Sequence, residues 1–230
     1  MMRWIALLGL TLSPAAMAGQ VLTNFTAMCA EGGALGPAAG EESHLAVSVI
    51  PVADTPFSIT DLRARLHHGS VAGATCDASG AHQLIVWTSD SAEPSASPAV
   101  QRRLTFPAEE VLGDFRMLSA ALDEPLQVNE GEFVFVAVDF GGSHPNVGCI
   151  DTCRSDAAPG MSWWSNAAAA PYSWSDLGES PPGGSLYIEV LGDPPPGTIP
   201  SEAPPAAEEP EVEADTEADT EAPRRRRRNR

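Results

Sequence analysis

The chain has 230 residues, with 31 acidic and 13 basic side chains and a formal net charge of −18. All of the basic residues are arginine. So large an excess of negative charge repels nucleic acid and anionic membranes, which excludes nucleic-acid binding as a function. Setting aside both ends leaves about 175 residues, enough for one domain with a sizeable core.

Residues 1–18 have the pattern of a secretory signal peptide. Met1–Arg3 is a short positive start, Trp4–Leu12 is an apolar run, and Ala16–Ala18 places small residues at the cleavage site. The apolar run is shorter than the roughly 20 residues that cross a bilayer, and no later segment reaches that length. We therefore predict an exported protein without a transmembrane segment, either periplasmic or extracellular at the cell surface.

Residues 43–193 read as an all-β domain, preceded by a segment, 19–42, that shows no strand pattern. Apolar runs are separated by Gly, Pro, Asp and Ser clusters, and no stretch keeps a helical period over three turns. About eight strands with long connections predict a two-sheet antiparallel sandwich of jelly-roll type. The predicted strands are Leu45–Ile50, Phe57–Leu66, Gln83–Thr88, Val100–Phe106, Phe115–Leu122, Glu132–Phe140, Met161–Trp164 and Ser185–Leu191.

Two of these runs indicate how their strands are buried. Arg63 and Arg65 alternate with apolar neighbours, which places both arginines on a solvated face. Phe133–Val138 is apolar at every position, as expected for a central strand covered on both sides.

Five segments stand out in this domain, namely Phe57–Arg63, Leu84–Trp87, Pro125–Val138, Tyr172–Trp174 and Leu186–Val190. Together they resemble jelly-roll modules of exported bacterial proteins of myxobacterial type, over roughly residues 43–192. Modules of this kind imply a binding or accessory role that is largely unassigned. The resemblance implies no catalytic residue.

The chain has four cysteines, Cys29, Cys76, Cys149 and Cys153. In an oxidising compartment an even number predicts two disulfides, with three possible connectivities. We favour Cys149–Cys153, which would close a tight loop, with Cys29–Cys76, which would tie the N-terminal segment to the sandwich. The alternative is a metal site formed by Cys149, Cys153 and His144, but zinc thiolate sites favour tighter spacing and reducing compartments. We therefore predict no metal and no cofactor.

The densest group of aromatic and polar side chains lies between residues 161 and 177. Planar rings beside amide and carboxylate groups suit carbohydrate, because a pyranose offers an apolar face for stacking and hydroxyls for hydrogen bonds. The alternatives are that the rings pack against the sandwich or contact another protein. The predicted ligand-binding residues are Trp163, Trp164, Asn166, Tyr172, Trp174 and Asp176.

No enzyme motif selects a catalytic residue. The sequence contains no His-Glu-x-x-His motif, P-loop or Gly-x-Gly-x-x-Gly, and Gly69–Gly73 lacks the glycine that a serine-hydrolase turn needs two places before Ser70. Adjacent His67 and His68 should point to opposite faces of a strand. We predict a non-enzymatic binding module. Its alternatives are a structural or protein-interaction subunit and a hydrolase with unidentified carboxylates, for which Asp139 with Asp151 and Asp156 with Asp176 are pairs.

Residues 194–230 change in composition and predict a disordered tail. Prolines and acids dominate up to Glu221, and the chain then reaches the cluster Arg224–Arg230. These arginines could contact an anionic envelope polymer. The expected partners are a polysaccharide or an envelope protein.

Overall fold

A computed structural model gives the fold of the chain. It describes residues 19–25, 29, 31–36, 45–71, 74–140, 148–155, 158–167, 169–179 and 184–195. The chain divides into two units, 1–198 and 199–230, and all described residues belong to the first. The predicted signal peptide lies outside the described residues, and so does the predicted tail beyond residue 195.

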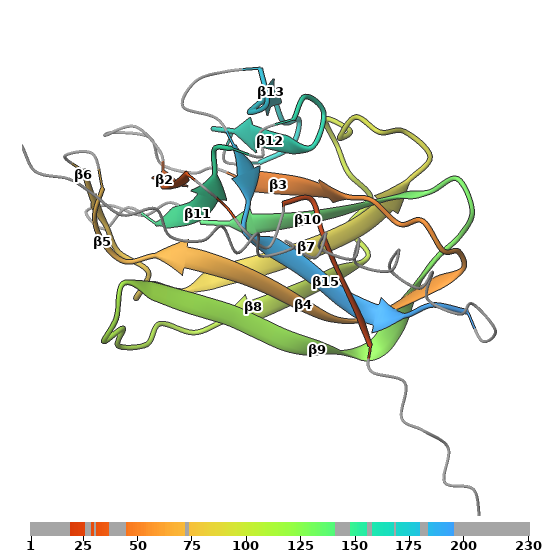
Figure 1. The fold of residues 1–230 in the computed structure, drawn as a ribbon, viewed down its shortest axis with the longest axis horizontal. Helices are drawn as coiled ribbons and strands as arrows, with labels where there is room; N and C mark the ends of the chain where they lie inside the picture. Colours follow the sequence, from red (N-terminus) through yellow and green to blue (C-terminus); the bar gives the residue numbers. More distant parts are fainter. Residues whose placement is uncertain are drawn as a thin grey trace, which may run out of the picture. The chain divides into compact units, whose positions relative to one another are not determined.

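The described residues form strands and no helix, and most of the strands belong to two antiparallel sheets (Figure 1). No helix in these ranges is therefore long and apolar enough to cross a membrane. The first sheet, here the β4 sheet, contains β1 (Gln20–Thr23), β2 (Gly32–Leu35), β4 (Phe57–His67), β9 (Phe115–Val128), β11 (Cys149–Cys153), β14 (Ser185–Leu186) and β15 (Ile188–Asp193). The second, the β10 sheet, contains β3 (Leu45–Ile50), β7 (His82–Ser89), β8 (Arg102–Phe106), β10 (Phe133–Asp139), β12 (Ser162–Ser165) and β13 (Ser175–Asp176). A separate hairpin joins β5 (Gly69–Val71) to β6 (Ala74–Cys76).

The eight principal strands have the order of a jelly roll. β4 pairs with β9 along one edge and with β15 along the other, and β15 pairs with β1. In the facing sheet the order is β3, β10, β7, β8. Successive strands of these eight thus alternate between the sheets, except that β7 and β8 pair directly within the β10 sheet, as in a jelly roll. The predicted two-sheet sandwich is confirmed, and β12 and β13 extend the β10 sheet beyond β3.

The burial of β4 and β10 follows their sequence patterns. In β4, Leu62, Ala64 and Leu66 point into the main core, whereas the intervening arginines are partly exposed. β10 lies between β3 and β7 and is buried on both faces, except at its two end residues, Phe133 and Asp139. Both sequence predictions are confirmed. The alternation in β4 is what presents arginines on the outer face of a sheet.

The prediction that segment 19–42 contains no strand is wrong. β1 pairs with β15, and β2 pairs with β11, so both strands extend the β4 sheet. Each has only four residues, and β2 begins with two glycines, so neither carries an alternating pattern long enough to be recognised. These two strands form because they pair with a neighbouring strand, and not because their own residues strongly prefer the β conformation.

The structure confirms two disulfides but contradicts the favoured connectivity. Cys29 is joined to Cys153, and Cys76 is joined to Cys149. Cys149 and Cys153 are the two ends of β11, and the ends of a five-residue extended strand lie about 13 Å apart, too far for a bond. The N-terminal segment is tied by a disulfide as expected, although to β11 rather than to Cys76. No cysteine is left as a thiol for the alternative metal site, and His144 lies outside the described residues.

Candidate functional site

The predicted aromatic site covers the outer face of the β10 sheet. That face carries a second apolar cluster, and Trp163, Tyr172 and Trp174 pack against it. The rings of Tyr172 and Trp174 lie 5.2 Å apart. The cluster beneath them consists of Leu45, Val47, Val49, Ile85, Trp87, Phe135 and Ala137.

Most polar groups of this aromatic cover already have partners within the chain. Trp163 Nε1 donates to the Gly160 carbonyl at 3.1 Å, and Trp174 Nε1 donates to the Ser95 carbonyl at 2.9 Å. The carboxylate of Asp176 accepts from two backbone N–H groups, those of residues 160 and 178, at 2.6 and 2.8 Å.

The remaining predicted residues fit the same description. Trp164 is buried and donates through Nε1 to Asn166 Oδ1. The space lined by Tyr172 and Trp174 is only about 10 Å³, far below what a sugar ring needs. The structure thus divides the predicted residues, because Trp164 lies in the main core whereas Trp163, Tyr172 and Trp174 pack against the second cluster. This geometry favours the packing alternative over a carbohydrate site.

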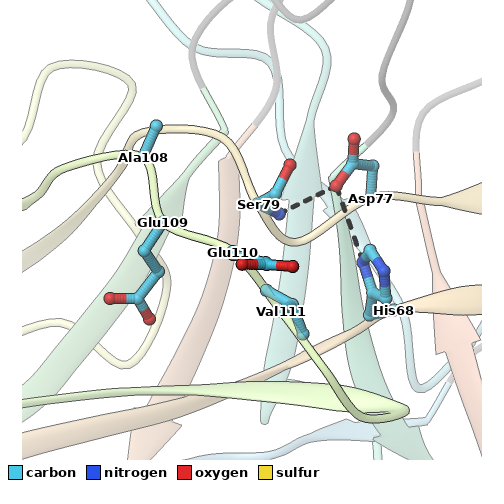
Figure 2. Close-up of a pocket in the computed structure, with 7 residues that line it drawn as sticks. All are labelled: His68, Asp77, Ser79, Ala108, Glu109, Glu110 and Val111. Atoms are coloured by element: carbon cyan, nitrogen blue, oxygen red, sulfur yellow. Dashed lines mark hydrogen bonds and ion pairs between the residues drawn. The ribbon is translucent and has the colours of Figure 1, made fainter.

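A wide, open hollow of about 550 Å³ lies at the end of β4 (Figure 2). Its lining brings a serine, a histidine and an aspartate together. In Figure 2 the side chain of Glu109 points away from His68 and Asp77. The lining residues are His68, Asp77, Ser79, Ala108, Glu109, Glu110 and Val111.

The contacts within this hollow do not form a catalytic triad. His68 Nδ1 accepts from the Ala78 N–H at 3.2 Å, so this nitrogen carries no proton to share with Asp77, 3.5 Å away. Asp77 instead accepts from the Ser79 N–H at 2.8 Å, and hydrogen bonds from Ser79 lower the pKa of its carboxyl. A catalytic triad needs the imidazole between the serine hydroxyl and the carboxylate. Here Ser79 and His68 both contact the carboxylate of Asp77 instead.

The loops that carry the lining residues are held by a buried arginine, Arg116. Its Nε donates to Glu109 at 2.8 Å, and its Nη atoms donate to three backbone carbonyls, those of residues 78, 80 and 107, at 2.7 to 3.0 Å. Arg116 thus ties two connecting loops together from inside. These contacts explain the shape of the hollow without a ligand.

The outer face of the β4 sheet combines arginines with exposed apolar side chains. Along β4, Arg65 pairs with Met117 of β9, and His67 pairs with Phe115. We call this surface the arginine face. It consists of Arg63, Arg65 and His67 on β4, Phe115, Met117 and Ser119 on β9, Asp151 on β11, and Tyr187 and Glu189 at β15.

Arg65 is the most constrained member of the arginine face. Its Nε donates to Asp151 Oδ2 at 2.6 Å, and its guanidinium carbon lies 3.9 Å from the ring centroid of Tyr187. The Phe115 ring is 5.6 Å from the same carbon. His67 Nδ1 lies 3.1 Å from the second oxygen of Asp151. The aspartate and the tyrosine together fix the plane of the guanidinium.

The apolar members of the arginine face are accessible. Phe115 is 52% exposed and Met117 is 45% exposed, both unusual for large apolar side chains in adjacent outward positions. A shallow hollow of about 110 Å³ beside them is lined by Arg63, Ala64, Arg65, Met117, Tyr187 and Glu189. A flat ligand could stack on the ring of Phe115 and reach the guanidinium of Arg65.

The sequence predicted that Arg63 and Arg65 face solvent but not what surrounds them. Their neighbours come from β9, β11 and β15, which are distant in sequence. The sequence did contain one signal for this surface: Phe115 and Met117 lie two residues apart in one strand, so both project from its outward side.

Of the carboxylate pairs considered from sequence, only Asp139 with Asp151 lies in the described residues, and the structure does not assemble it. Asp139 ends β10 and Asp151 lies in β11, so the two belong to different sheets, and Asp156 lies outside the described residues.

No protein-family model, curated protein or solved structure matches this chain.

Proposed function

We propose that the chain is an exported, non-enzymatic module that binds carbohydrate on the arginine face. The observation that carries this proposal is the fixed guanidinium of Arg65 beside the exposed ring of Phe115. An exposed ring supplies the stacking surface for a pyranose, and an oriented set of donors supplies hydrogen bonds to its oxygens.

Export is supported by two features that arise in different parts of the chain. Two disulfides lie in the described residues, as is usual for proteins of oxidising compartments. Residues 1–18 carry the signal-peptide pattern. The ligand would then be a polysaccharide in the periplasm or at the cell surface.

A glycan array tests the proposal, with Phe115→Ala as the decisive variant. We expect the protein to be retained on a defined group of glycans and Phe115→Ala to weaken retention about tenfold, since stacking of a ligand ring on one aromatic side chain contributes about 1–3 kcal/mol. The melting temperature should change little, because this ring is 52% exposed.

A matched control separates the site from a general loss of apolar surface. Leu112 is 92% exposed, is not among the residues of the arginine face, and can be replaced by alanine in the same assay. Trp174→Ala tests the predicted aromatic site in parallel. Retention that depends on Trp174 but not on Phe115 would move the site to the aromatic cover and contradict the proposal.

The second candidate function is a protein-interaction subunit, and it rests on β9. Among the described strands β9 pairs only with β4, so its other edge is open, and Phe115 and Met117 project beside it. Open strand edges with apolar neighbours are suited to adding a strand of another chain. An empty glycan array together with concentration-dependent self-association, reduced by Met117→Glu, would favour this function.

A further inference from the structure

We infer that the ligand of the arginine face is an acidic sugar whose carboxylate is bound by the two Nη groups of Arg65. This inference rests on the proposed function and adds to it the charge of the ligand. A uronate residue has the two required parts, a pyranose ring that can stack and a planar carboxylate attached to it.

The first argument concerns the hydrogen-bond donors of Arg65 that remain for a ligand. Its Nε is used by Asp151 at 2.6 Å, whereas within the described part of the chain its Nη atoms have no hydrogen-bond partner. The two Nη groups at the end of the guanidinium therefore point away from Asp151 as a pair of donors. Two parallel N–H groups match the two oxygens of a carboxylate better than the single hydroxyls of a neutral sugar.

The second argument is that the guanidinium is already oriented. It is layered on Tyr187 at 3.9 Å, and Tyr187 is itself packed against Phe25, with the ring centroids 4.4 Å apart. Asp151, only 9% exposed in its side chain, anchors the opposite end of the group. Binding an anion therefore requires little further ordering of this side chain, which is the main cost for a free arginine.

The third argument is the position of the stacking ring. The Phe115 centroid lies 5.6 Å from the guanidinium carbon of Arg65. A sugar ring seated on Phe115 would place a carboxylate one bond outside its own ring, toward this guanidinium. Neighbouring Arg63 lies on the same strand face, and its contact with Glu189 is long, 3.8 Å, which leaves it able to assist.

Other charges on the face do not compete for the same ligand position. Asp151 is turned inward and has both oxygens engaged, by Arg65 and by His67. Glu189 lines the same hollow as Arg65, but in the strand register it lies beside Arg63, 3.8 Å from that guanidinium. An anion at Arg65 therefore meets one partly exposed carboxylate, and Arg63 offsets its charge.

The test compares acidic sugars with their neutral methyl esters by isothermal titration calorimetry on the mature chain. Trisaccharides of galacturonate and of mannuronate serve as probes, and each ester keeps the ring while removing the charge. We expect at least one acid to bind about tenfold more tightly than its ester, the scale of one charge-assisted bidentate contact. Arg65→Gln should abolish that preference.

Two further variants make the result specific. Arg65→Lys keeps the charge but not the planar pair of donors, so it should restore only part of the preference. Arg102→Gln removes an arginine from β8 of the other sheet and should leave binding unchanged. Arg65→Gln leaves Asp151 without its ion-pair partner, and this could unfold the protein. In that case Arg63→Gln serves instead, because Arg63 does not contact Asp151, and it should reduce the preference for the acid over its ester about threefold.

The possible failures are distinguishable. Equal or tighter binding of the esters, or binding of neutral array glycans alone, would overturn the acidic ligand while leaving the proposed function in place. A preference for sulfated neutral sugars over uronates would overturn the carboxylate. An empty array and no heat with either probe would overturn both proposals.

Discussion

At the scale of single residues, His82 is a buried histidine kept neutral by its surroundings. Burial, and then the nearby positive charge of Arg116, lower its pKa to about 4 from an ordinary value of 6.5. Within the described residues neither ring nitrogen has a hydrogen-bond partner. The ring edge packs at 5.8 Å against Phe140.

This histidine predicts a loss of stability in acid. Between pH 6.5 and pH 4 the unfolded chain binds a proton that the folded chain does not, so the free energy of unfolding falls as the pH decreases through this window. The full effect is about 3 kcal/mol for a shift of this size. Urea unfolding at several pH values should show it, and His82→Leu should flatten the slope. An unchanged slope in the variant would assign the acid sensitivity to other groups.

Arg116 gives a second prediction at this scale. Replacing it with methionine keeps much of the apolar stem but leaves three buried or partly buried carbonyls without their donor. Each unsatisfied group costs about 1–3 kcal/mol, so we expect a loss of roughly 3 kcal/mol or more in chemical denaturation. Arg102→Met, on a partly exposed side chain, should cost less than about 0.5 kcal/mol. Similar losses for the two variants would contradict a structural role for Arg116.

At the scale of elements, the strands that could be predicted are those whose burial produces a pattern within one segment. β4 alternates between apolar and polar residues, and β10 is apolar throughout, so the sequence alone placed both correctly. β1, β2 and β11 are too short for such a pattern and exist because they pair with longer strands. The disulfide error has the same origin, because a tight loop was expected where β11 is extended.

The disulfide connectivity leads to a prediction for this scale. Non-reducing peptide mapping should recover Cys29 with Cys153 and Cys76 with Cys149. The bridges span sequence separations of 124 and 73 residues, so each should stabilise the fold by about 4–5 kcal/mol in the chain-entropy model. The paired change of Cys76 and Cys149 to serine should lower the unfolding free energy accordingly. Recovery of a peptide linking Cys149 to Cys153 would contradict the extended conformation of β11.

At the scale of the whole molecule, the candidate site shows how far sequence reasoning reached. The aromatic segment around Trp163 and Trp174 was recognised by composition, but composition does not reveal that a second apolar cluster lies beneath these rings. The arginine face combines residues from four strands of one sheet, and its members are unremarkable when taken singly. Only the strand register places the ring of Phe115 beside the guanidinium of Arg65.

One disulfide is nested inside the other along the chain. The bridge between Cys76 and Cys149 lies wholly inside the stretch closed by Cys29 and Cys153, and both inner and outer closures end on β11. A protease that cuts once anywhere between residues 29 and 153 therefore releases no fragment, because a covalent path around the cut remains. Such a nicked chain would keep all of its residues and gain only one water molecule until its disulfides are reduced. For the proposed export among extracellular proteases, the bridge between Cys29 and Cys153 would make many single cleavages silent.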